Sequence, residues 1–176
     1  MSIEPDIRRW NGKSARDIRA IYARHKERTD IAHDLVACCA QDDLETGATW
    51  LLKHHLEASS STLNSALSDR LIRLGTGFGS WEARLHLLQV LDRLEIPETA
   101  IGALTRFVDA ALEDRKTLVR AWAYHGLQHL ARLDPLRRAE ILATLKNAEE
   151  TEHAASARVR LRKALAAVSK PGASCR

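Results

Sequence analysis

The segment HLLQVLDRL at residues 86–94 is matched, 39 residues later, by HGLQHLARL at residues 125–133. The two stretches share His, Leu, Gln, Leu, Arg and Leu at equivalent places. In the first of them apolar side chains cover most of the circumference of a helix, so that helix must be covered on at least two sides. The repeat therefore predicts helices that pack against neighbouring units of the same kind.

Prolines mark the same repeat. Pro97 and Pro135 each open the helix that follows one of these stretches, a position where the missing N–H costs nothing. A looser pair of helical segments precedes residue 75, and the segment at 152–168 resembles the start of one further unit. A repeat of roughly 40 residues made of two helices is typical of α-solenoids, and no segment has the period of a strand.

The composition favours the same fold class. The chain has 176 residues, enough for one domain with a substantial core, and its apolar content is 45% with only 5% aromatic residues. Leucine and alanine supply most of the apolar residues, and both favour helices. We therefore expect an all-α protein.

The quoted residues also carry a family resemblance. LVRAWAYHGLQHLARL at 118–133 and LDPLRRAEIL at 133–142 resemble the HEAT-repeat pattern, in which Val-Arg precedes apolar residues and an Asp-Pro turn follows. The resemblance extends over about residues 44–168 and is good for the two units between 80 and 149.

The resemblance implies a short right-handed superhelix of about nine helices in antiparallel pairs, forming one domain. Its expected parts are capping helices in 1–43, helix-pair repeats in 44–149, a capping helix in 150–168 and a disordered tail in 169–176. On the two regular first helices, His86, Gln89 and Arg93 and the matching His125, Gln128 and Arg132 are expected to face outward.

Proteins of the HEAT kind are mostly binding surfaces for other proteins and less often for nucleic acids. The second helix of each pair would form the concave surface, and periodicity predicts polar positions on it that carry charges of both signs. This mixture favours a protein partner, so we expect a non-catalytic scaffold or adaptor. The predicted contact residues are Arg106, Asp109, Glu113, Thr144 and Asn147.

The charge distribution supports a second hypothesis. Residues 1–30 carry a net charge of +3, residues 31–115 of −6 and residues 116–176 of +7. Basic ends attract anionic partners such as nucleic acids, although a terminal repeat also needs a solvated polar face. Under the nucleic-acid hypothesis the contact residues are Arg137, Arg138, Arg158, Arg162 and Lys163.

A weaker resemblance extends this second hypothesis toward base-excision repair. HEAT-like alkylpurine DNA glycosylases use exposed tryptophans and an aspartate in a basic cleft. Here no carboxylate shares the helical face of Trp81 or Trp122. For Trp50, Trp81 and Trp122 we therefore expect packing between repeats.

Enzymatic alternatives have little support in the sequence. His125 and His129 lie at i, i+4 and could present two imidazoles to a metal, but no third ligand is apparent. GTGFGS at 75–80 follows a helix instead of a strand, which predicts a connection and not a phosphate loop. The sequence thus predicts no catalytic residue, metal or cofactor, and an enzyme remains a third hypothesis.

The remaining features concern location. Cys38 and Cys39 lie in an apolar helical stretch and should pack as small hydrophobic residues. No signal-peptide core and no run of about 20 apolar residues is present. We expect a cytoplasmic protein without a membrane partner, whose oligomeric state the sequence does not predict.

Overall fold

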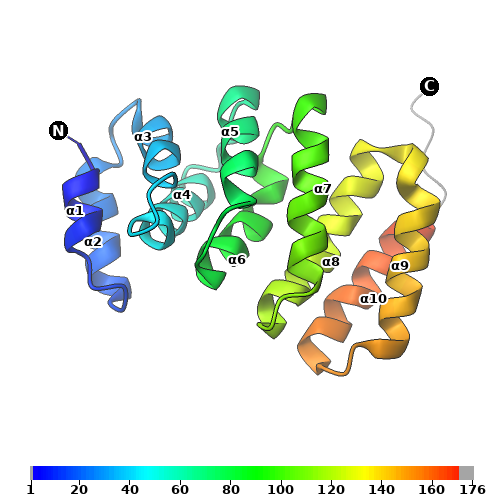
Figure 1. Cartoon of the computed structure of the whole chain (residues 1–176). Coiled ribbons are helices and arrows are strands. Elements are labelled where there is room, and N and C mark those ends of the chain that lie inside the picture. The colour runs from blue at the N-terminus through cyan, green and yellow to red at the C-terminus, as the bar shows by residue number, and fades with distance from the viewer. Residues whose placement is uncertain (1, 171–176) are drawn as a thin grey trace. The chain divides into compact units, whose positions relative to one another are not determined.

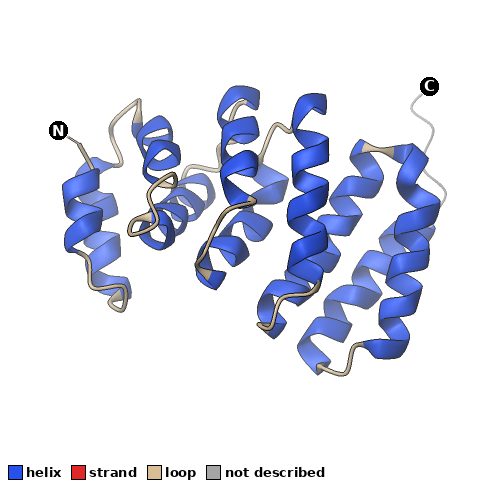
Figure 2. Cartoon of the chain, in the orientation of Figure 1, coloured by secondary structure: helices blue, strands red, loops and turns tan. Residues whose placement is uncertain are grey.

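A computed structural model describes residues 2–170, which form ten α-helices and two short 3-10 helices (Figures 1 and 2). These residues contain no strand, only an isolated bridge between Leu63 and Leu94. The all-α prediction is confirmed, and the helix not predicted is the short α1 (Glu4–Arg9). Of the predicted tail, Ser169 ends a helix, and residues 171–176 lie outside the described part.

The chain divides into two compact units, unit 1 (Met1–Ala103) and unit 2 (Leu104–Arg176), within helix α7 (Glu98–Leu112). Unit 1 holds α1, α2 (Ala15–His25), α3 (Ile31–Cys38), α4 (Glu45–Ala58), α5 (Ser65–Gly75), α6 (Trp81–Val90), the 3-10 helix η1 (Leu91–Arg93) and the start of α7. Unit 2 holds the rest of α7, α8 (Thr117–Leu133), η2 (Pro135–Arg137), α9 (Arg138–Thr151) and α10 (Ala155–Ser169). The single repeat domain with its caps stays a prediction.

Helix α4 lies at the centre of unit 1, where it packs against α2, α3 and α6. Its leucines Leu51, Leu52 and Leu56 are fully buried. Gly47, in its first turn, lets α1 approach closely, because a Cβ there would lie 2.7 Å from Ile7 Cγ2. A residue that weakens the helix in isolation thus permits contact between two helices.

Helix α8 has the corresponding role in unit 2, where it packs against α9 and α10. Figure 1 shows α9 and α10 running side by side in opposite directions. Leucine and alanine supply most of the buried surface between these helices, as the composition predicted. The buried side chains include Ala123, Leu127, Leu130, Ile141, Leu145, Leu161, Ala164 and Val168.

The structure shows which residues of α6 and α8 occupy equivalent positions. In each unit the fourth residue of a first helix is an arginine that binds two carbonyls of the preceding loop. Arg84 Nη1 donates to the carbonyls of Phe78 and Gly79 at 2.9 and 3.0 Å. Arg120 Nη1 donates to those of residues 114 and 115 at 2.9 and 3.5 Å. The two helices begin at residues 81 and 117, a spacing of 36.

The alignment at 39 residues matched the ends of these helices instead of their starts. Helix α6 stops after 10 residues and continues as η1, whereas α8 runs for 17 residues. Because the two helices differ in length, aligning their leucine-rich ends gives an offset of 39 residues, whereas aligning their starts gives an offset of 36. In the structural register His86 corresponds to Trp122 and not to His125.

The predicted outward-facing histidines are not on an open surface. His86 is half-buried, and its Nδ1 lies 3.0 Å from Thr49 Oγ1 of α4. His125 is half-buried as well, and the neighbouring His129 is only 4% exposed. Both histidines are therefore only partly exposed, because these first helices are covered on more sides than one polar stripe suggested, and their place on an outer surface stays a prediction.

The burial of His86 makes the stability of the fold depend on pH. Burial lowers the pKa of His86 from 6.5 to about 4, so the folded protein holds this ring neutral. Its stability contribution is present above pH 6.5 and is lost as the pH falls from 6.5 toward 4. We expect urea titrations at several pH values to show the free energy of unfolding falling over this interval.

The variant His86→Gln should flatten this dependence, because an amide can still contact Thr49 but does not titrate. Burial also lowers the pKa values of His54 and His55, so the dependence should shrink without vanishing. A pH profile identical to that of the parent protein would assign the whole effect to other groups.

The sequence also predicts helix caps at Ser14, Ser61 and Ser80, and two of these three are confirmed. Ser14 accepts from the backbone N–H of Asp17 at 3.1 Å, and Ser80 from that of Ala83 at 3.3 Å, as expected. The start predicted after Ser61 is wrong, because α5 begins after Asn64. Residues 62–64 are held instead by bonds of Leu63 to the backbone of residues 93 and 95 at 2.7 and 3.0 Å.

Among the described residues, no helix combines the length and the apolar character that a bilayer crossing requires.

Candidate functional site

A cavity of about 570 Å³ opens in unit 2 between α8, α9 and the segments that precede α8 and α10. Its size falls within the range of ligand pockets. Charged, polar and apolar side chains share the lining, which consists of Leu112, Glu113, Arg120, Tyr124, Thr144, Asn147, Ala148, Thr151, Glu152, His153 and Ala154.

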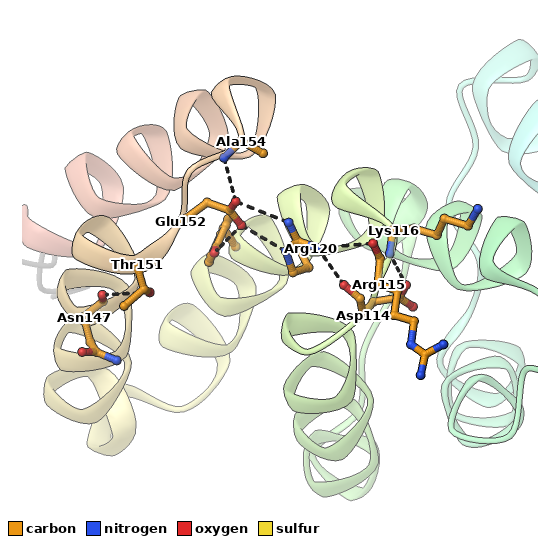
Figure 3. A network of polar contacts seen from close by, with 9 residues as sticks. Asp114, Arg115, Lys116, Arg120, Asn147, Thr151, Glu152 and Ala154 are labelled. Atoms are coloured by element: carbon orange, nitrogen blue, oxygen red, sulfur yellow. Dashed lines mark hydrogen bonds and ion pairs between the residues drawn. The ribbon is translucent and has the colours of Figure 1, made fainter.

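The carboxylate of Glu152 lies at the centre of a polar network in this lining (Figure 3). It accepts hydrogen bonds from Arg120 Nε at 3.1 Å and Nη2 at 3.4 Å, and from Tyr124 Oη at 3.3 Å. It also accepts from the backbone N–H of Ala154 at 2.9 Å, just before α10 begins. One side chain thus ties α8 to the start of α10.

Each ionisable group of the network is held in one protonation state. Its hydrogen bonds from Arg120 keep the pKa of Glu152 below its ordinary value, and Glu152 in turn raises the pKa of Arg120. Burial raises the pKa of Tyr124 to about 12. At neutral pH the network therefore holds a carboxylate, a guanidinium and a neutral phenol. None of these three is suited to proton transfer near neutrality, so the network supports binding better than acid–base catalysis.

The predicted protein-binding residues are all exposed, and three of them line the cavity. Glu113 follows α7, whereas Thr144 and Asn147 lie on α9. Arg106 and Asp109 are exposed on α7 but do not line the cavity.

Sequence reasoning missed Arg120, Tyr124 and Glu152. The Val-Arg pair of the quoted repeat contained the signal for Arg120. Glu152 lies in a link between helices, where no periodicity marks a residue.

The predicted nucleic-acid residues fall into two groups. Arg137 is paired with Glu140 at 2.9 Å and bonds Thr105 Oγ1 at 3.0 Å. Arg138 donates to carbonyls at the end of α10. These two arginines therefore make contacts within the fold. The exposed cations of the set lie together on α10: Arg158, Arg162 and Lys163.

The tryptophans for which packing between repeats was expected are only partly covered. Trp50, Trp81 and Trp122 are each half-buried. Trp50 stacks on His54 with ring centroids 5.1 Å apart. The guanidinium carbon of Arg160 lies 3.3 Å from the ring centroid of Trp122, which covers one face of that indole.

The two adjacent cysteines are confirmed as packing residues. Cys38 and Cys39 are 4% and 3% exposed. Burial raises the pKa of Cys38 to about 11 and raises that of Cys39 as well. Both side chains are thiols at neutral pH, which excludes them as activated nucleophiles. Cys175 lies outside the described residues.

No protein-family model matches the chain, and no curated protein or solved structure is significantly similar to it. The HEAT-like resemblance therefore depends on the repeat and on the contacts described above.

Proposed function

We propose that this chain is a non-catalytic, HEAT-like scaffold or adaptor that binds another protein at the cavity of unit 2. One observation carries the proposal. Glu113, Thr144 and Asn147 were selected by periodicity as exposed polar positions, and all three line one cavity although they come from two separate segments. A concave surface with few fixed polar groups is the usual form of a binding site.

The regular helix spacing supports the HEAT-like assignment. Helices α4, α6, α8 and α10 begin at residues 45, 81, 117 and 155, spacings of 36, 36 and 38. Within unit 1 α4 packs on α6, and within unit 2 α8 packs on α10. The equivalent carbonyl contacts of Arg84 and Arg120 support the proposal of one repeated structural unit. The right-handed superhelix is the part of this proposal that comes from the resemblance alone.

The charges of the cavity favour a peptide segment over a phosphate backbone. Arg120 and Glu152 neutralise one another, and the exposed carboxylate of Glu113 leaves the lining with a negative charge. Asn147 offers an exposed amide, while Leu112 offers apolar surface. A segment with a basic side chain, an amide backbone and apolar groups complements this lining.

A photo-crosslinking amino acid at Asn147 should therefore yield a specific protein adduct. The same amino acid at Lys146, which is exposed on α9 but does not line the cavity, should not. With the adduct partner purified, Asn147→Ala or Glu113→Ala should weaken binding about tenfold in calorimetry, the effect of losing one contact residue. Lys146→Ala is the matched control.

Equal adducts from both positions, or a dissociation constant unchanged in both cavity variants, would remove the cavity as the binding site.

Nucleic-acid binding is the second candidate, and helix α10 is the observation that favours it. Among Ala155–Ser169 there is no acidic residue, and Arg158, Arg162 and Lys163 are exposed. Arg158 and Arg162 lie one turn apart, so both could contact phosphates of one strand. The extension to base excision is less supported, because Arg160 covers a face of Trp122 that a base would need for stacking.

Salt dependence separates the two candidates. If α10 binds phosphates, replacing its three exposed cations by alanine should reduce the slope of log K against log salt by about 3, one for each lost contact. Fluorescence anisotropy with a mixed-sequence duplex measures this slope, and Asn147→Ala serves as the control. A duplex that does not bind at low salt eliminates this candidate.

A further inference from the structure

Two histidines of α8 are arranged like ligands of one metal ion. The Nε2 atoms of His125 and His129 lie 3.2 Å apart, and the two rings are nearly perpendicular, at 81°. Imidazole nitrogens bind Zn²⁺ at about 2.0–2.1 Å, so two of them on a tetrahedral ion are roughly 3.3 Å apart. The two rings are joined by a hydrogen bond at this distance, so the pair already has the separation that two ligands of one ion require.

Packing holds both rings in this position. Their i, i+4 spacing places them on the same side of α8. His129 is 4% exposed, and the ring of Trp122 meets that of His125 edge-on at 5.5 Å. Ligands whose rotamers are fixed by packing lose little conformational entropy on binding a metal.

The positive charge of Arg132 disfavours a metal cation beside His129. Its Nη2 lies 2.8 Å from His129 Nδ1 and 3.2 Å from Nε2. Donation to Nδ1 places the ring proton on Nε2, the atom that faces His125. An ion bound at Nε2 requires that proton to move to Nδ1 or to solvent, with Arg132 turning away. Because Arg132 is exposed, its long side chain can turn toward solvent.

We propose that His125 and His129 bind a divalent transition metal of the Zn²⁺ class through their Nε2 atoms. Imidazole is a good ligand for Zn²⁺, Ni²⁺ and Cu²⁺, which defines the class of ion. The sequence alone did not support this site because it offered no third ligand; the interatomic distance supplies the new argument. The proposal does not depend on the proposed protein-binding function.

Isothermal titration of the full chain with ZnCl₂ in a non-chelating buffer tests the site. We expect one Zn²⁺ per chain, and His125→Gln should weaken binding at least tenfold. His33→Gln is the matched control, because the side chain of His33 is 64% exposed, and it should bind Zn²⁺ as the parent does. Arg132→Ala should bind more tightly, since it removes a competing positive charge.

Circular dichroism should show that the His125→Gln protein is folded, because the ring of His125 is only half-buried. Co²⁺ provides an independent readout, since binding at the two imidazoles changes its visible d–d absorption, and His125→Gln should lose this change. The absence of saturable Zn²⁺ binding, or binding that His125→Gln leaves unchanged, would overturn the proposal.

Discussion

Replacing Glu152 by alanine should lower the free energy of unfolding by about 3 kcal/mol, the usual cost of removing one partner of a buried ion pair. The carboxylate is 7% exposed and the Arg120 guanidinium side chain 24%. The variant leaves Arg120 with a charge that solvent can reach only in part, and removes acceptors for Tyr124 and for the backbone of Ala154. Urea denaturation followed by circular dichroism measures the loss.

Glu150→Ala is the matched control, because Glu150 is exposed in the last turn of α9, two residues before Glu152, and it should change stability by less than about 0.5 kcal/mol. The pH dependence gives a second check. Because the pKa of Glu152 is lowered by folding, its contribution is present above pH 4.5 and is lost as the pH falls through the folded value. The alanine variant should lose this part of the acid sensitivity. Equal stability of the two variants would show that the network contributes nothing to the fold.

Gly47→Ala should destabilise the protein by about 2 kcal/mol, in the range typical of overpacking. The direction of the change in stability is informative, because replacing glycine by alanine in an exposed helix stabilises that helix by about 1 kcal/mol. The new Cβ would lie 2.7 Å from Ile7 Cγ2 and 3.3 Å from Trp10 Cε3, so α1 would have to move away from α4. Urea denaturation gives the change in stability.

A double-mutant cycle isolates the cause of this effect. In an Ile7→Ala background the clashing Cγ2 is absent, so Gly47→Ala should cost clearly less than in the parent chain. Gly77→Ala is a control with ordinary contacts, the nearest atom being Leu74 O at 3.6 Å, and it should change stability by less than about 1 kcal/mol. A stabilised Gly47→Ala protein would contradict the close approach of α1.

Much of the fold could be predicted because its main signals are local. Apolar spacing shows helices, Ser14 and Ser80 cap the helices that follow them, and Pro135 opens a helical turn. The errors concern features that local sequence patterns do not specify. Ser61 does not start a helix because residues 62–64 bind the chain near Leu94. The early end of α6 shifted the apparent repeat by three residues.

The candidate site was predictable only in part, for a similar reason. Exposed positions such as Asn147 follow from helical period, whereas the position of Glu152 depends on how a loop meets Arg120. The separation of His125 and His129 depends on side-chain rotamers that spacing does not specify.

The carbonyl contacts of Arg84 and Arg120 allow the sequences of the loops before α6 and α8 to change in evolution. Both arginines recognise backbone oxygens, and the loop residues they bind differ completely, Phe78 and Gly79 in one unit and Asp114 and Arg115 in the other. Side chains there can be exchanged without removing the contact that shapes the loop. Because the segment after α7 also borders the cavity, new partner preferences could arise by substitution in that loop while the helices stay unchanged.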